Sequence, residues 1–236
     1  MSARFEELAW RETPMGEISL RRRREPTLDV DVYEVKLGDE YLMSSLFTVA
    51  EEELARLGLA AHAGDRLDVL VGGLGLGYTA VAALDDPRVS ALSVVEALPD
   101  VVDWHERGLL PCSAALTSDP RTTLVTADFF ATVGAGEPLS PEQPDATYDV
   151  LLVDIDHTPG HVLHPSHAAF YTDAGLRRMA TRLRPAGVFA LWSDDPPDEP
   201  FVALLSSVFP HVDARVVEFD NFLTGGTSAN TVYVAR

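Results

Sequence analysis

The stretch Leu67-Asp-Val-Leu-Val-Gly-Gly-Leu-Gly-Leu-Gly-Tyr78 decides the fold, because an apolar run gives way here to four glycines within six positions. Leucine and valine at this density are typical of a strand that is covered on both faces of a sheet. Glycines allow a tight turn that other residues cannot follow. Residues 78–84 then have the composition of a helix, whose free N–H groups face the turn. This order of strand, turn and helix predicts a nucleotide site.

The spacing of the glycines separates different kinds of nucleotide site. The dinucleotide fingerprint requires G-x-G-x-x-G, whereas Gly73, Gly75 and Gly77 form G-x-G-x-G, with Tyr78 where the last glycine of the fingerprint would fall. No Gly-Lys-Ser/Thr sequence follows, so the turn is not a P-loop. The spacing disfavours NAD and resembles the adenosyl-binding turn of class I methyltransferase-like folds. We therefore expect these three glycines to contact an adenosyl group.

The next predicted strand tests this interpretation. Residues 90–96 form a short apolar run that ends in Glu96, 23 residues after Gly73. A carboxylate at this distance from the turn can accept hydrogen bonds from both ribose hydroxyls of a nucleoside. The position of Glu96 agrees with an adenosyl site.

Two further predicted strands also end in acidic residues. Residues 122–126 lead into Asp128 and Phe129, which offer an acceptor for the adenine amine and a ring for its face. Residues 148–154 end in Asp154 itself. Each acid alone reads equally well as a helix cap or a turn residue. Together with the glycine turn, they indicate an adenosyl site at the carboxyl edge of a parallel sheet.

The remaining pattern predicts an α/β protein with a Rossmann-like class I methyltransferase fold: a seven-stranded, mostly parallel sheet that ends in an antiparallel hairpin. A small N-terminal β appendage over residues 1–47 precedes the adenosyl-binding domain, 48–236. Residues 131–147 read as a loop and 183–187 as a turn. Expected helices are 48–62, 78–84, 99–108, 168–182 and 201–209; other expected strands are 17–21, 30–37, 41–43, 188–192, 212–219 and 230–235.

Composition narrows the class of protein. The chain has 236 residues and a net charge of −19, with Lys36 as its single lysine. This charge argues against nucleic-acid binding and suits a cationic substrate. One cysteine, Cys112, fits a reducing compartment. The segment 1–10 is charged and lacks an apolar signal core, and no apolar run is long enough to span a membrane. We expect a soluble, cytoplasmic protein.

Nearly the whole chain resembles the spermidine synthase-like branch of the class I S-adenosylmethionine-dependent methyltransferase superfamily. The resemblance implies a polyamine aminopropyltransferase: a decarboxylated S-adenosylmethionine donor, a small-molecule amine acceptor and no metal. The matching residues are Val71-Gly72-Gly73, Glu96, Asp128, Tyr148-Asp149-x4-Asp154, Phe170-Tyr171 and Leu183-Arg184-Pro185-x-Gly187.

The chain departs from this family at positions that concern the reaction. Aminopropyltransferases of the family carry an aspartate within the glycine turn, which holds the aminopropyl end of the donor, where this chain has Gly75. The family's glutamine after the N-terminal hairpin falls on or near Leu42, and its Tyr-His/Gln-Glu triplet survives at best as Glu52. His157 replaces the family's second acid in the loop, and Asp156 beside it is a possible substitute.

Asp154 is the best candidate for a catalytic base. By the resemblance it matches the family's base, and a partly desolvated carboxylate at a strand end can accept the proton of an attacking amine. The sulfonium of the donor is itself the leaving group, so we expect no metal. Asp156, His157 and Tyr78 are candidate contacts of the acceptor.

The loop after Asp154 contains four of the seven histidines: His157, His161, His164 and His167. Such density is found in metal sites, but the interleaved prolines prevent a helix that would align the rings. We favour a lid over the acceptor.

Three hypotheses stay open from the sequence. The first is aminopropyl transfer to an amine, and the second is methyl transfer from intact S-adenosylmethionine. A metal-dependent form of the second would use Asp154 with Asp194 and Asp195. The third is a non-catalytic adenosyl-binding protein. The N-terminal strands also offer a pairing surface for a homodimer.

Overall fold

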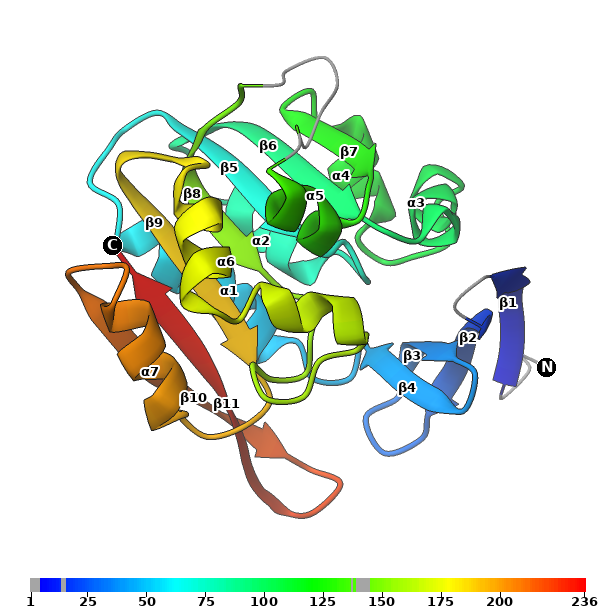
Figure 1. Cartoon of the computed structure of the whole chain (residues 1–236). Coiled ribbons are helices and arrows are strands. Elements are labelled where there is room, and N and C mark those ends of the chain that lie inside the picture. The colour runs from blue at the N-terminus through cyan, green and yellow to red at the C-terminus, as the bar shows by residue number, and fades with distance from the viewer. Residues whose placement is uncertain (1–4, 14–15, 137, 139–144) are drawn as a thin grey trace.

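The computed structural model describes residues 5–13, 16–136, 138 and 145–236. Four strands between Phe5 and Ser44 form an antiparallel sheet, the N-terminal sheet, with the order β1-β2-β3-β4. This sheet stands beside the main body of the protein (Figure 1), as the predicted β appendage. Its strands are β1 (Phe5–Thr13), β2 (Gly16–Glu25), β3 (Val30–Leu37) and β4 (Glu40–Ser44).

The main sheet has seven strands in the order β10-β11-β9-β8-β5-β6-β7. The strand before the glycine turn, β5, lies inside this sheet and runs parallel to both neighbours. The strand β11 is antiparallel to β9 and to β10, which confirms the predicted fold class and its terminal hairpin. The strands are β5 (Leu67–Gly72), β6 (Val89–Glu96), β7 (Thr122–Thr126), β8 (Tyr148–Val153), β9 (Leu183–Ser193), β10 (Val212–Asn221) and β11 (Gly226–Ala235).

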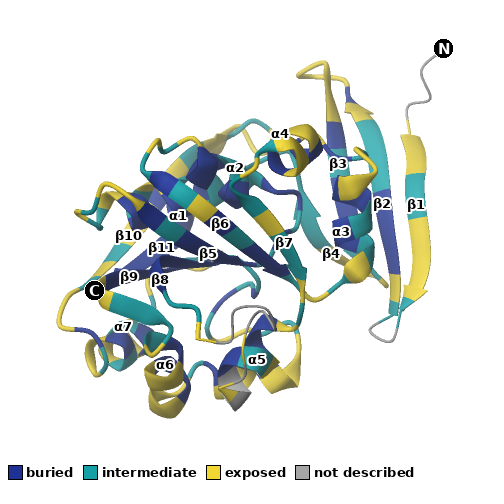
Figure 2. Cartoon of the chain, turned by 90° about the horizontal axis from the view of Figure 1, so that it is seen from above, coloured by how far each residue is buried: buried dark blue, intermediate teal, exposed yellow. Residues whose placement is uncertain are grey.

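Helices cover both faces of the main sheet (Figure 2). One face carries α1 (Val49–Ala60), α2 (Tyr78–Leu84), α3 (Pro99–Glu106) and α4 (Ser113–Ser118). The other carries α5 (Phe129–Ala135), the 3-10 helix η1 (Pro165–Ala169), α6 (Asp173–Ala180) and α7 (Glu199–Ser206). Each face has its own apolar core, so strands buried on both sides separate the two cores. None of the helices in the described ranges is long and apolar enough to cross a membrane.

The N-terminal sheet is attached through apolar side chains. Ile18, Leu20 and Val35 are fully buried and belong to the same core as α1, α2 and α3. Full burial of side chains of this size contributes about 1.5–3 kcal/mol each. The attachment brings β4 close to the glycine turn, because Met43 of β4 packs against Gly75.

The structure corrects the predicted loop at 131–147. Helix α5 occupies its first part, because Asp128 caps the helix: its Oδ1 accepts the backbone N–H of Ala131 at 2.9 Å. Residues 137 and 139–144 lie outside the described residues. Helix α4 was also not predicted; it has only six residues, between Cys112 and Asp119.

Three other predicted boundaries differ from the structure. Helix α6 begins at Asp173 rather than 168, because the hydroxyl of Thr172 caps it by accepting the N–H of Gly175 at 3.1 Å. Strand β9 includes the predicted turn 183–187, where Ala186 adopts φ +65° and the register with β8 shifts. Helix α7 begins and ends a few residues before the predicted 201–209.

Candidate active site

The glycine turn lies against the end of strand β8. Gly73 has φ +95° and Gly75 has φ +48°, in the region that favours glycine. A Cβ atom on Gly73 would overlap the carbonyl oxygen of Asp154, and one on Gly75 would lie 2.9 Å from Met43 Sδ. The backbone N–H of Asp154 donates to Gly72 O at 2.8 Å. The turn is therefore held directly beside the predicted base.

Glu96 holds the turn from the neighbouring strand. Its Oε2 accepts the backbone N–H groups of Leu74 at 3.0 Å and Gly75 at 3.4 Å, and its Oε1 accepts that of Leu98 at 2.9 Å. Burial raises the pKa of Glu96, while these backbone N–H groups oppose the rise. The carboxyl group therefore sits at the end of β6, with its position fixed by three backbone donors.

His105 of α3 contacts the same turn through a hydrogen bond. The ring is fully buried, and Nε2 lies 2.9 Å from Gly75 O. Burial lowers the pKa of His105, so the neutral ring donates from Nε2 to this carbonyl oxygen. Sequence reasoning missed His105, since one histidine on a partly apolar helix carries no specific signal.

A cavity of about 290 Å³, here called the donor cavity, opens between the turn and the ends of β6 and β7. Asp128 lines it with one carboxylate oxygen already used to cap α5. Phe129 is only 2% exposed and its ring packs against Gly72, while Phe130 lines the cavity beside it. The other donor-cavity residues used below are Gly73, Gly75, Glu96 and Asp154.

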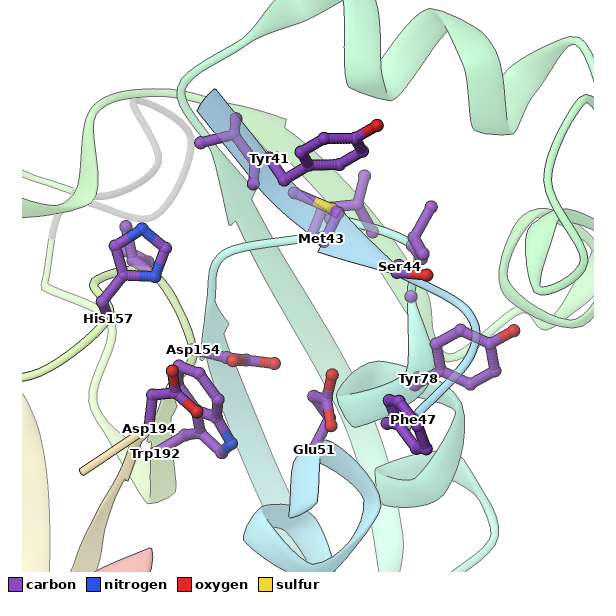
Figure 3. A pocket seen from close by; sticks show the side chains of 16 residues that line it. Tyr41, Met43, Ser44, Phe47, Glu51, Tyr78, Asp154, His157, Trp192 and Asp194 are labelled. Carbon is purple, nitrogen blue, oxygen red and sulfur yellow. The ribbon is translucent and has the colours of Figure 1, made fainter. Parts of the chain in front are cut away.

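A second cavity of about 390 Å³, here called the acceptor cavity, lies between β4, the start of α1 and the end of β9 (Figure 3). Its described lining includes three carboxyl groups and four aromatic rings but no lysine or arginine. This combination suits a positively charged ligand, which carboxylates and ring faces attract. The lining includes Tyr41, Met43, Phe47, Glu51, Tyr78, Asp154, His157, Trp192 and Asp194.

The two cavities meet. Met43, Gly75 and Asp154 line both of them, together with Leu42 and Ile155. A group bound at this junction contacts the glycine turn on one side and the Asp154 carboxyl group on the other. Two ligands, one in each cavity, would approach each other here.

Asp154 is held by a threonine at the start of α2. The hydroxyl of Thr79 donates to Asp154 Oδ2 at 2.5 Å. Burial raises the pKa of Asp154 to about 6, although the Thr79 hydrogen bond favours the charged form. The same cavity contains Glu51, whose pKa rises to about 8 because it is buried and because it lies near Asp154.

Of the three other predicted contacts of the acceptor, two line the acceptor cavity and one does not. Tyr78 and His157 line the acceptor cavity, and burial raises the pKa of Tyr78 to about 12. Asp156 is only 2% exposed and accepts hydrogen bonds from Tyr171 OH, at 2.9 Å, and from His167 Nδ1, at 2.8 Å. Asp156 therefore anchors the loop from inside, and the prediction that it contacts the acceptor disagrees with its position.

The four loop histidines form two neighbouring pairs of rings, His157 with His161 at 5.5 Å and His164 with His167 at 5.9 Å between centroids. His167 pairs with Asp156, whereas the ring of His164 caps η1 and contacts Ser166. His157 Nε2 lies 3.3 Å from Glu40 of the N-terminal sheet. In the described part of the chain, no group of three or more His, Cys, Asp or Glu side chains is arranged to hold a metal ion. The expected absence of a metal stays a prediction.

The structure adds cavity-lining residues that sequence reasoning missed. Glu51 points into the cavity (Figure 3), whereas Glu52, matched above to the family triplet, binds Arg56 on the surface of α1. Trp192 comes from the end of β9, and its indole Nε1 is buried without a partner among the described residues. The match to the family triplet named Glu52, which lies one residue further along α1.

Known proteins resemble this chain in sequence over part of its length. No protein-family profile matches it. Putrescine N-methyltransferase 3 from Nicotiana tabacum is 31% identical over 137 residues, which are 58% of this chain and 32% of that protein. Putrescine N-methyltransferase 1 from Nicotiana attenuata is 30% identical over the same share of this chain. The match thus spans about one third of the length of these curated relatives.

Solved structures resemble it over 79–97% of its length. A spermidine synthase in complex with the transition state analogue AdoDATO has a TM-score of 0.72 at 18% identity, covering 97% of this chain and 73% of that one. Spermidine synthase from Thermotoga maritima gives 0.71 at 19% identity, covering 97% and 72%. Human methyltransferase-like protein 13 in complex with SAH gives 0.59 at 23% identity, covering 79% and 82%. The chain therefore has the class I S-adenosylmethionine-dependent methyltransferase fold, in the form that spermidine synthases have.

Proposed function

We propose that this chain is a transferase that moves an alkyl group from an S-adenosyl donor to an amine of the polyamine type. The observation that carries the proposal is the junction of two chemically different cavities at Gly75 and Asp154. The donor cavity has the residues expected for an adenosyl group, and the acceptor cavity has carboxyl groups and aromatic rings. The resemblance to putrescine N-methyltransferases and spermidine synthases supports the same class of reaction.

The reaction uses residues at this junction. An amine arrives as an ammonium ion, attracted by the carboxyl groups of the acceptor cavity. Asp154 takes its proton, so that the free lone pair attacks the carbon beside the sulfonium. The carbon–sulfur bond breaks, its electron pair stays on sulfur, and a neutral thioether leaves. Alignment of the two bound molecules contributes several kcal/mol to such a step.

Methyl transfer from intact S-adenosylmethionine fits the turn best. Gly75 lacks the carboxylate that the family's aminopropyltransferases use to hold the donor, and Met43 Sδ fills the space that a side chain there would occupy. The curated relatives named above are putrescine N-methyltransferases. Aminopropyl transfer from the decarboxylated donor is the second candidate, favoured by the spermidine synthase fold over 97% of the chain.

Product analysis tests the proposal. The purified protein is incubated with putrescine and either donor, and the amine products are identified by mass spectrometry. We expect a methylated diamine from S-adenosylmethionine. An aminopropylated product from the decarboxylated donor alone would select the second candidate. Calorimetry with methylthioadenosine separates an inactive adenosyl-binding protein from one that does not bind adenosyl groups at all.

A further inference from the structure

We propose that Glu51 is a second catalytic carboxyl group, which keeps a proton while the acceptor cavity is empty and releases it when a cationic amine binds beside Asp154. This inference rests on the proposed function and adds a residue to it. Glu51 is the third residue of α1, and its side chain enters the cavity next to Asp154 (Figure 3).

The surroundings of Glu51 are acidic on several sides. Asp154 at the end of β8 and Asp194 at the end of β9 both act on it, as does Glu52 on its own helix. Tyr78 of α2 and His157 of the following loop face the same cavity, and the β10–β11 hairpin presents Asn221 and Asn230 next to Glu51. In the described part of the chain, the one hydrogen bond to the Glu51 carboxyl group comes from its own backbone N–H.

This arrangement favours one proton shared between Glu51 and Asp154. Neighbouring buried carboxyl groups cannot both ionise at low cost without a cation between them. The pKa of Glu51 lies at about 8 and that of Asp154 at about 6. In the empty cavity near pH 7, the pair therefore carries a single proton.

Thr79 decides which carboxyl group keeps this proton. Its Oγ1 lies 2.5 Å from Asp154 Oδ2 and 3.1 Å from the backbone oxygen of Glu51. A hydroxyl has one proton to donate, and the shorter contact assigns it to Asp154. A donated hydrogen bond stabilises the charged form of Asp154, so the shared proton stays on Glu51.

The pair changes state when an ammonium group binds. The positive charge replaces the proton as the partner of both carboxyl groups, so Glu51 releases its proton to solvent. The bound ammonium then passes one of its own protons to Asp154, and the amine attacks the carbon beside the sulfonium. The product is a secondary ammonium ion with a neutral thioether, so the charges balance.

Calorimetry tests the release directly. Putrescine is titrated into protein saturated with methylthioadenosine, in two pH 7 buffers with different heats of ionisation. We expect about one proton released per bound amine in the wild type, with a marked decrease in Glu51→Gln. Glu53→Gln is the matched control, because Glu53 lies on the same helix and pairs with Arg56 at the surface. Equal release in all three proteins would overturn the proposal.

Two further measurements distinguish failure of the Glu51 proposal from failure of the proposed function. Infrared spectroscopy of the free wild-type protein should show the signal of a carboxyl group that titrates near neutral pH, and this signal should be absent in Glu51→Gln. If the wild-type protein lacks the signal, the proposal is overturned, even if no amine binds. Absence of transfer with every amine, with this signal present, would instead refute the proposed function. Selective loss of affinity for the decarboxylated donor in Glu51→Gln, with methylthioadenosine unaffected, would assign Glu51 to the donor and overturn its acceptor role.

Discussion

The carboxyl groups of the two cavities differ in how many hydrogen-bond donors hold them. In the donor cavity, Glu96 accepts three backbone N–H groups, so its position is fixed before any ligand binds. In the acceptor cavity, Asp154 accepts one hydrogen bond from a hydroxyl group, and within the described ranges the Glu51 carboxyl group accepts one only from its own backbone N–H. Under the proposed function, the donor side holds its carboxyl group with backbone hydrogen bonds, whereas the acceptor side keeps carboxyl groups available for a cation and for proton transfer. Variants on each side should therefore fail in different ways.

The largest effect is expected from Gly73→Ala on the donor side. The added Cβ would overlap the carbonyl oxygen of Asp154, and φ +95° is unfavourable for alanine. Binding of methylthioadenosine should weaken by about 10³-fold or more in calorimetry. Gly108→Ala is the control, because Gly108 has φ +70° but no atom near the added Cβ. If both variants bind equally well, contact with Asp154 does not shape the turn.

Asp154→Asn should distinguish most clearly between loss of proton transfer and loss of adenosyl binding. Asparagine keeps the size of the side chain but removes the base, so turnover should decrease by about 10²–10⁴-fold. Affinity for methylthioadenosine should change little, because this ligand is uncharged and asparagine keeps the size of the side chain that lines the donor cavity. Steady-state kinetics and calorimetry on the same preparation provide the comparison. Unchanged turnover would show that another group accepts the proton.

Glu96→Ala should act on the other cavity and weaken the binding of adenosyl ligands. It removes charge-assisted hydrogen bonds, each worth roughly 1.5–3 kcal/mol, so adenosyl ligands should bind about 10–10³-fold more weakly. The variant also frees the backbone N–H groups of Leu74, Gly75 and Leu98. A thermal melt identifies loss of folding, and Glu96→Gln gives an intermediate case. Full affinity in a folded Glu96→Ala protein would remove Glu96 from the site.

These predictions show what local sequence can establish. Gly73 and Glu96 lie at the ends of neighbouring parallel strands, where chain order alone brings them together. Glu51 and Glu52 differ by one position on α1, and adjacent helical residues point about 100° apart. Only the packing of α1 decides which of them faces Asp154. The sequence therefore indicated which residues lie together at the glycine turn, but it did not indicate which of these two glutamates lines the acceptor cavity.

The positions of Met43 and Asp156 also depend on tertiary packing rather than on local sequence. Met43 reaches the glycine turn because the whole N-terminal sheet packs on the main core, which no local pattern encodes. Asp156 follows a strand end, as Asp154 does, but its partners His167 and Tyr171 come from residues 11 and 15 positions later. The type and spacing of these residues could not distinguish a buried anchor from a substrate contact.

The carboxyl pair also predicts a pH effect on stability. Folding raises the pKa of Glu51 to about 8 and that of Asp154 to about 6. The contribution of this pair to stability is therefore greatest below the unfolded values near 4, and it decreases as the pH rises from there through the folded values. We expect the stability contributed by the pair to fall by up to about 5 kcal/mol between pH 5 and pH 8.5. Urea unfolding of Glu51→Gln should show a smaller loss than the wild type; an equal loss would contradict the pairing.

The smallest expected effect concerns donor choice. Met43→Ala with Gly75→Asp frees the space above the turn and adds a carboxylate, and aspartate tolerates φ near +48° better than most residues. The ratio of affinities should move about tenfold toward decarboxylated S-adenosylmethionine. Met43→Ala alone is the control. A double variant with an unchanged ratio would show that Gly75 does not set donor preference.

The central claim is that the two cavities form one site joined at Gly75 and Asp154. A compound that links adenosine, through a thioether sulfur, to an aminoalkyl chain should occupy both cavities together. Calorimetry should show it binding about 10²-fold or more tightly than methylthioadenosine, because the second half binds without a second loss of freedom. Asp154→Asn should reduce this gain. Equal affinity of the two compounds for the wild-type protein would contradict the account.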